Sequence, residues 1–200
     1  MEDSYLKGLR NNAINYLFNV DIIRDNSYVY DQSMVQGGLE KEDLEFSDPA
    51  LVFTIDNFTV YNFENRVIKN GILFINFNGK LKYDDDPNNC FETEFTDIIS
   101  ACKNKGININ FVNFVPLRTR DTETFKLMFR RTELNGIVSI SSVLDYLYKN
   151  YIKKIIDYLE PEALIILDED IIKIVNKYDK FRIINGNEEN LIDSVASMLQ

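Results

Sequence analysis

Three carboxylates directly follow the most apolar segment of this sequence. Residues 164–167 are all aliphatic, and Asp168, Glu169 and Asp170 come immediately after them. Ligands bind beyond the carboxyl ends of strands in open α/β sheets, and Mg²⁺ prefers the hard oxygen ligands that Asp and Glu provide. The spacing therefore predicts a metal site at Asp168 and Asp170. The same residues would also suit the first turn of a helix, with Asp168 or Glu169 as its cap, and the sequence leaves both interpretations open.

Arginines form the main basic concentration of the chain. They are Arg118 and Arg120 after a predicted strand, and Arg130 and Arg131 on the helix predicted to follow. A guanidinium group binds phosphate or carboxylate through two parallel hydrogen bonds, so these residues could form an anion-binding site. The alternative is ion pairing with the acidic side chains around them, which are Asp121, Glu123 and Glu133.

The 200 residues contain no histidine. This excludes a Ser-His-Asp triad, a Cys-His pair and histidine-ligated zinc. The phosphate-binding pattern GxxxxGK[ST] is also absent. We therefore expect no catalytic residue and no cofactor, apart from Mg²⁺ if the carboxylates after residue 167 act in an enzyme.

The elements that must position these residues alternate between strands and helices. Val, Ile, Phe, Tyr and Thr are concentrated in the segments predicted as strands, which are 51–55, 58–63, 72–77, 107–115, 137–140, 163–167 and 181–184. Helical spacing and capping residues predict helices over 4–20, 91–103, 122–134, 141–159, 168–178 and 188–199.

This pattern predicts an α/β fold. We expect a mixed sheet with an antiparallel N-terminal part and βαβ units in the C-terminal half, flanked by helices. Residues 1–200 are expected to form a single domain. Within it, residues 1–48 would be an N-terminal helix with an irregular acidic extension, and residues 50–200 the α/β core.

The last third of the chain resembles a STAS domain. The resemblance is carried by Ile137-Val138-Ser139-Ile140-Ser141-Ser142-Val143, by the apolar segment 163–167, and by Asn187-Glu188-Glu189-Asn190-Leu191. In that family a strand ends in Asp-Ser-Ser-Gly before a helix; here Ile140 and Val143 replace the Asp and the Gly. The resemblance implies a small partner-binding module. It also implies that Ser141 or Ser142 matches the serine that a partner kinase phosphorylates in some members.

The formal net charge of −10 argues against direct binding to nucleic acid or to an anionic membrane, because like charges repel. It is compatible with a partner protein that has a basic surface. The two cysteines cannot form a disulfide framework, and the first residues lack the basic and apolar regions of a signal peptide. We therefore expect a soluble protein of a reducing cytoplasm.

The leading functional hypothesis is a non-enzymatic protein–protein interaction or regulatory module. Tyr146 and Tyr148 fall outside the predicted apolar face of their helix, so they are expected to be exposed and available to a partner. One alternative is an Mg²⁺-dependent enzyme acting on a phosphate-containing substrate. Another is an acidic nucleic-acid mimic, such as a phage or bacterial inhibitor or an immunity protein, using the acidic runs 40–45 and 84–86.

Overall fold

The computed structural model describes residues 3–19, 28–30, 52–56, 58–62, 67–80, 100, 102, 104–119 and 140–184. The elements of this part, in chain order, are α1 (Ser4–Asn19), β1 (Tyr28–Tyr30), β2 (Val52–Ile55), β3 (Ile72–Asn76), β4 (Gly79–Lys80), β5 (Ile109–Asn113), β6 (Leu117–Thr119), α7 (Ile140–Leu147), η2 (Tyr148–Ile152), α8 (Lys153–Leu159), β7 (Ala163–Ile166), α9 (Glu169–Tyr178) and β8 (Ile183–Ile184).

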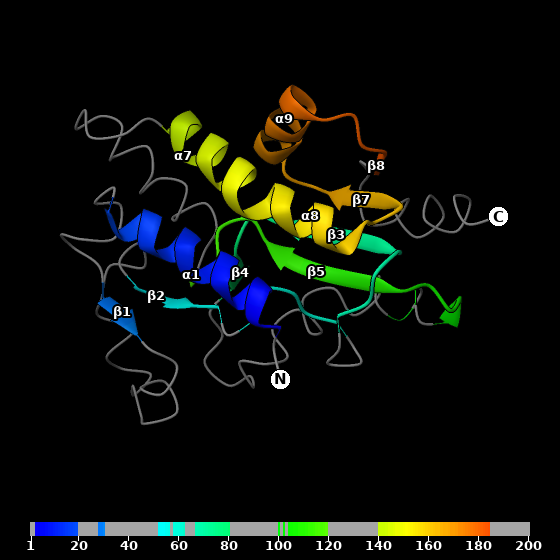
Figure 1. Cartoon of the computed structure of the whole chain (residues 1–200), viewed down its shortest axis with the longest axis horizontal. Helices are drawn as coiled ribbons and strands as arrows, with labels where there is room; N and C mark the ends of the chain where they lie inside the picture. Colours follow the sequence, from blue (N-terminus) through cyan, green and yellow to red (C-terminus); the bar gives the residue numbers. More distant parts are fainter. Residues whose placement is uncertain are drawn as a thin grey trace.

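The central sheet has four parallel strands in the order β5-β3-β7-β8. This confirms the α/β class, with helices covering a parallel sheet (Figure 1). Every residue of β7 is buried, which is what an uninterrupted aliphatic segment indicates for a strand covered on both faces.

Alternate residues of the central strands build two apolar layers. Leu73 and Ile75 of β3 and Leu164 and Ile166 of β7 belong to the larger layer, together with residues of α1, α7, η2, α8 and α9. On the opposite face, Phe74, Phe111 and Ile165 are among the members of a smaller layer. Because successive side chains of a strand point to opposite faces, each strand contributes to both layers.

A second sheet has the order β1-β2-β6-β4. Two strands of the central sheet lead directly into it, since β3 is followed by β4 and β5 by β6, and β4 and β6 are parallel neighbours. In the described part of the chain, the expected antiparallel N-terminal part of the central sheet is not found. The strands β2 and β3 lie in different sheets, and the antiparallel partner of β2 is β6.

The predicted strand 58–63 is also absent from the residues that the structure describes there. That segment contributes a single antiparallel bridge, between Tyr61 and Phe111. Two backbone hydrogen bonds of 2.9 and 2.8 Å join these residues and pair the outer edge of β5. The polar and turn-forming residues around Tyr61 limit the pairing to one position.

The helix predicted over 141–159 is continuous from Ile140 to Leu159 but contains one π-helical turn, η2. The turn is closed by a bond from the Lys153 N–H to the Tyr148 carbonyl, five residues back. The helix ends at Glu160, whose φ of 51° is left-handed, and Pro161 follows.

The N-terminal helix α1 belongs to the core rather than lying outside it. Leu6, Leu9, Ala13 and Leu17 are buried in the larger apolar layer. The predicted helices 122–134 and 188–199 and most of the predicted helix 91–103 lie outside the described residues. Within the described part, no helix combines the length and apolar character needed to cross a membrane.

Candidate functional site

Arg118, predicted as part of an anion-binding site, is buried where the two sheets meet. Its Nε donates a 3.0 Å hydrogen bond to Oδ1 of Asp56, and its Nη2 donates a 2.8 Å bond to the Tyr61 hydroxyl. The other oxygen of Asp56 accepts a 2.7 Å bond from Nδ2 of Asn113. The side chains of Arg118 and Asp56 are only 3% and 1% exposed, so this guanidinium binds an internal carboxylate.

The environment of Asp56 acts on its pKa in opposite directions. Burial raises the pKa, while the positive charge of Arg118, the Asn113 amide and the charge of Arg10 oppose that shift. Gly79 packs against the same group: a Cβ added there would lie 2.8 Å from Cγ of Arg118. The cluster therefore holds β2, β4, β5 and β6 together at the sheet junction, and its chemistry is structural.

The other three predicted anion-binding residues, Arg120, Arg130 and Arg131, lie outside the described residues. The same is true of the acidic runs 40–45 and 84–86. The anion site and the acidic face therefore remain predictions. The actual carboxylate partner of Arg118, Asp56, is 62 residues away in sequence, which is why its pairing could not be derived from the neighbouring acids.

Asp168 lies at the topological switch point of the central sheet. After β3 the chain continues to β5 on one side of the sheet, and after β7 it continues to β8 on the other side. The carboxyl ends of β3 and β7 are therefore neighbours at this point. Oδ1 of Asp168 accepts bonds of 3.0 and 3.1 Å from the N–H groups of Asp170 and Ile171. Asp168 is thus the N-cap of α9, the second of the two interpretations that the sequence left open.

Asp170 is exposed on the first turn of α9, where Lys173 contacts it at 3.5 Å. Among the described residues, no group of three or more Cys, Asp or Glu side chains is arranged to hold a metal ion. A magnesium site at Asp168 and Asp170 therefore remains a prediction, and it would need ligands beyond these two residues. Ser141 and Ser142 lie in the first turn of α7, and both are exposed.

A different surface brings aromatic side chains together. Two tyrosine pairs join α1 to the helix Ile140–Leu159, which run antiparallel. Tyr5 packs on Tyr158 with ring centroids 5.3 Å apart, and Tyr16 stacks on Tyr146 at 3.5 Å. Tyr5 and Tyr16 are 11 residues apart, which is about three turns and places the two pairs about 16 Å apart along α1.

Small and polar residues lie between the two pairs. On α1 these are Gly8 and Asn12, and on the partner helix the four-residue spacing from Tyr146 to Tyr158 gives Asn150 and Lys154. We call these eight residues the tyrosine seam: Tyr5, Gly8, Asn12, Tyr16, Tyr146, Asn150, Lys154 and Tyr158. None of them is buried, and Tyr5, at 47%, is the more exposed of the two exposed large hydrophobic residues described.

Hydrogen bonds and charge fix the geometry at one end of the seam. Asp3 caps α1 by accepting a 2.7 Å bond from the Tyr5 N–H, and its second oxygen accepts a 2.9 Å bond from the Tyr158 hydroxyl. The Tyr158 bond lowers the pKa of Asp3, and the same bond raises the pKa of Tyr158. Nζ of Lys69 lies 4.9 Å from the Tyr158 ring centroid.

Of the two tyrosines expected to be exposed on the long helix, one is partly exposed and the other is buried. Tyr146 is partly exposed on the seam, but Tyr148 is buried, and its hydroxyl donates a 2.5 Å bond to Asp179. The π turn changes the rotation of the chain at this point, so a regular helical wheel misplaces Tyr148. Asn150 donates a 3.1 Å bond to the Tyr146 carbonyl within the same turn.

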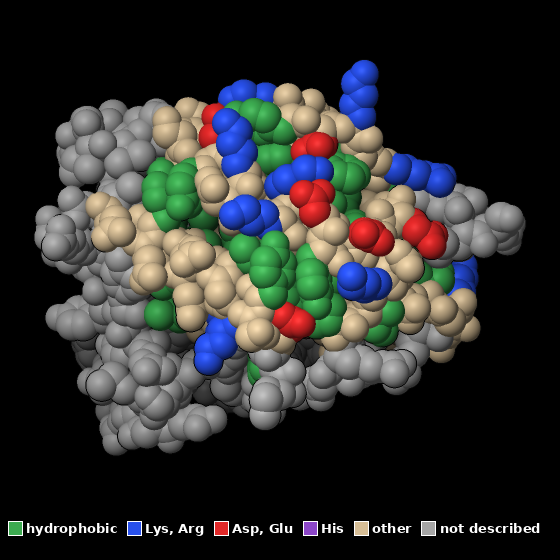
Figure 2. Space-filling model, viewed as in Figure 1, with side chains coloured by type: hydrophobic (Ala, Val, Ile, Leu, Met, Phe, Trp, Pro, Cys, Tyr) green, Lys and Arg blue, Asp and Glu red, His purple; other side chains and the backbone are tan. Residues whose placement is uncertain are grey.

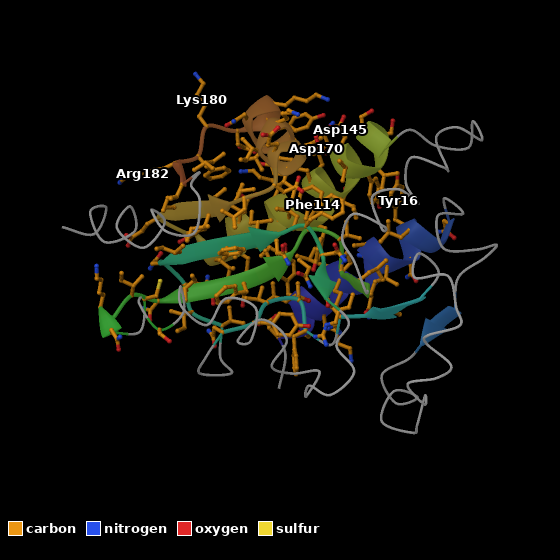
Figure 3. The ribbon with its side chains drawn as sticks, turned by 180° about the vertical axis from the view of Figure 1, so that it is seen from behind. Tyr16, Phe114, Asp145, Asp170, Lys180 and Arg182 are labelled. Atoms are coloured by element: carbon orange, nitrogen blue, oxygen red, sulfur yellow. The ribbon has the colours of Figure 1, made fainter. Side chains whose placement is uncertain are left out.

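The opposite flank of the long helix faces α9 and is occupied by ion pairs. Lys177 pairs with Asp145 at 2.8 Å, and Lys153 contacts Asp179 at 3.1 Å. Viewed from behind, Tyr16 lies at one side of the molecule and Lys180 and Arg182 at the other (Figure 3). Lys180 and Arg182 follow α9 and belong to neither helix of the seam.

Comparison of the chain with protein-family models, with curated proteins and with solved structures finds no match. The resemblance to STAS domains therefore stays a prediction.

Proposed function

We propose that this chain is a non-enzymatic protein-binding module of a regulatory kind, and that the tyrosine seam is its binding surface. The observation that supports this most is the pair of tyrosine contacts joining α1 to the long helix on an exposed face. Figure 2 shows hydrophobic side chains near the centre of this face, with both basic and acidic side chains around them.

The composition of the seam suits a protein partner. A tyrosine offers a large apolar ring with a polar tip, so it can bury area in a partly wet contact at low conformational cost. Glycine and asparagine beside tyrosine provide adaptable hydrogen bonding, as they do in antibody combining sites. The rings are already held by each other and by Asp3, so little side-chain freedom remains to be lost on binding.

The other hypotheses receive less support from the described residues. A phosphate-processing enzyme would need Asp168 as a metal ligand, whereas Oδ1 of this residue already caps α9. A nucleic-acid mimic would depend on the acidic runs outside the described part. The STAS resemblance is compatible with a regulatory module, since Ser141 and Ser142 are exposed.

The test compares partner capture by matched variants. The wild type, a Tyr5→Ala/Tyr16→Ala variant and a Lys180→Ala/Arg182→Ala control are used as bait in lysate of the native host, and bound proteins are quantified by mass spectrometry. A partner retained by the wild type and the control is purified and titrated. The proposal predicts that the tyrosine variant binds it at least tenfold more weakly, because exposed tyrosines often dominate interface energy.

Thermal unfolding of each variant shows whether the fold is retained. Equal binding by the tyrosine variant would contradict the proposal. Substrate turnover by the purified chain that Asp168→Ala abolishes and Asp168→Ser does not restore would contradict its non-enzymatic part.

A further inference from the structure

The helix α1 has no Asp or Glu from Ser4 to Asn19. Lys7 is exposed on this helix, whereas Arg10 is buried and its charge acts on Asp56. Lys69 lies over the Tyr158 ring, and Lys154 is exposed one turn before that tyrosine. In the part of the chain that the structure describes, neither lysine forms an ion pair, and the Asp3 carboxylate at this end of the seam accepts a hydrogen bond from Tyr158.

At this end of the seam the exposed ammonium groups of Lys69 and Lys154 provide the positive charge that an approaching segment meets. The expectation of a partner with a basic surface comes from the net charge of the whole chain and stays a prediction.

Gly8 lies on the exposed face of α1, one turn from both Tyr5 and Asn12. A Cβ built there has no atom within 4 Å, and Gly8 is not among the residues with positive φ. A glycine inside a helix is unfavourable relative to alanine. Within the described residues, neither packing nor backbone conformation requires it, but a glycine permits close approach by another backbone.

From these observations we propose that the seam docks an acidic segment of a partner protein, whose backbone crosses Gly8 and whose carboxylates meet Lys69 and Lys154. This rests on the proposed function, because it assigns the chemistry of the partner at the same surface. The rings of Tyr5 and Tyr158 would provide the apolar platform beside the two ammonium groups.

Selection from a displayed library of random 15-residue peptides tests the partner chemistry. The full chain is the target, and a Lys69→Glu/Lys154→Glu variant serves for counter-selection. We expect the retained peptides to be enriched at least threefold in Asp and Glu over the library. A selected peptide should lose at least tenfold in affinity for the charge-reversed variant and none for Lys180→Glu. No binders, or binders without acidic enrichment, would overturn the inference.

Gly8→Ala tests the close approach. This variant should raise the midpoint of thermal unfolding and yet bind the selected peptide at least fivefold more weakly. Asn176→Ala, an exposed helical substitution on α9, should leave peptide binding unchanged. Unchanged binding by Gly8→Ala would overturn the proposal that the partner's backbone crosses α1 at Gly8.

The outcomes separate this inference from the proposed function. If the Tyr5→Ala/Tyr16→Ala variant loses the host partner while charge reversal and Gly8→Ala do not, the seam binds a partner of other chemistry and only the inference fails. If none of these variants changes partner binding, both fail. Self-association of the wild type in sedimentation that the tyrosine variant abolishes would identify a second copy as the occupant, and would also overturn the acidic-segment assignment.

Discussion

Arg118 and Asp56 form a buried ion pair, with 3.0 Å between Nε and Oδ1, across the junction of the two sheets. The pair connects the middle of β6 with the residue after β2. Tyr61 and Asn113 provide further hydrogen bonds to the same two side chains. Because the two side chains pair in a buried site, the loss of one leaves the other charge buried without this counter-charge.

We therefore predict strong coupling between the two positions. Arg118→Met and Asp56→Leu should each destabilise the protein by about 3–5 kcal/mol, and the double variant should cost less than their sum by about 1–3 kcal/mol. Urea unfolding of the wild type, the two single variants and the double variant measures this double-mutant cycle. Additive costs would mean that the two side chains do not stabilise each other.

The role of Asp168 as a helix cap gives a second prediction. Asp168→Ala should cost about 1 kcal/mol of stability, because two N–H groups at the start of α9 lose their acceptor. Asp168→Ser should remain within about 0.5 kcal/mol of the wild type, since serine caps about as well as aspartate. Chemical denaturation compares them, and equal losses in both variants would show that capping is not what the carboxylate provides.

The aliphatic strand 163–167, the long helix and the capped helix after residue 168 could be predicted because each has a strong local pattern. The pairing of β2 with β6 and the carboxylate partner of Arg118 could not, because they depend on contacts between residues more than 60 positions apart. The sequence predicts only part of the tyrosine seam. It indicates that Tyr146 is exposed, but the pairing with Tyr16 depends on the antiparallel packing of two helices distant in sequence.

The bond between Tyr158 and Asp3 predicts a pH dependence. The folded pKa of Asp3 lies below its ordinary value of 3.8, so the stabilisation it brings is present above that value and is lost as the pH falls through the folded pKa. Tyr158→Phe removes the hydroxyl whose hydrogen bond is the largest cause of the lowered Asp3 pKa. NMR titration should show the Asp3 pKa rising toward 3.8 in this variant.

The stability difference between the wild type and Tyr158→Phe should therefore shrink as the pH is lowered below about 4. Asp145, whose pKa is also lowered, by its bond to Lys177 on the other flank, is the internal control and should titrate identically in both proteins. An unchanged Asp3 pKa would contradict the assigned contact.

Two glycines should respond in opposite directions to the same substitution. Gly8→Ala should stabilise the fold by about 0.5–1 kcal/mol, because the added methyl group enters open space on a helix. Gly79→Ala should destabilise it by about 1–3 kcal/mol, because its Cβ would lie 2.8 Å from Arg118 Cγ and 3.0 Å from Asn113 Nδ2. Differential scanning calorimetry distinguishes them, and a shift of the same sign in both would refute the packing described here.

Hydrogen–deuterium exchange with the purified host partner tests the central claim most directly. The account predicts that partner binding slows exchange in α1 and in the helix from Tyr146 to Tyr158, while the first turn of α9 exchanges at an unchanged rate. Protection centred on residues 167–171, with α1 unaffected, would place the binding surface at the carboxyl ends of the strands and contradict the assignment to the tyrosine seam.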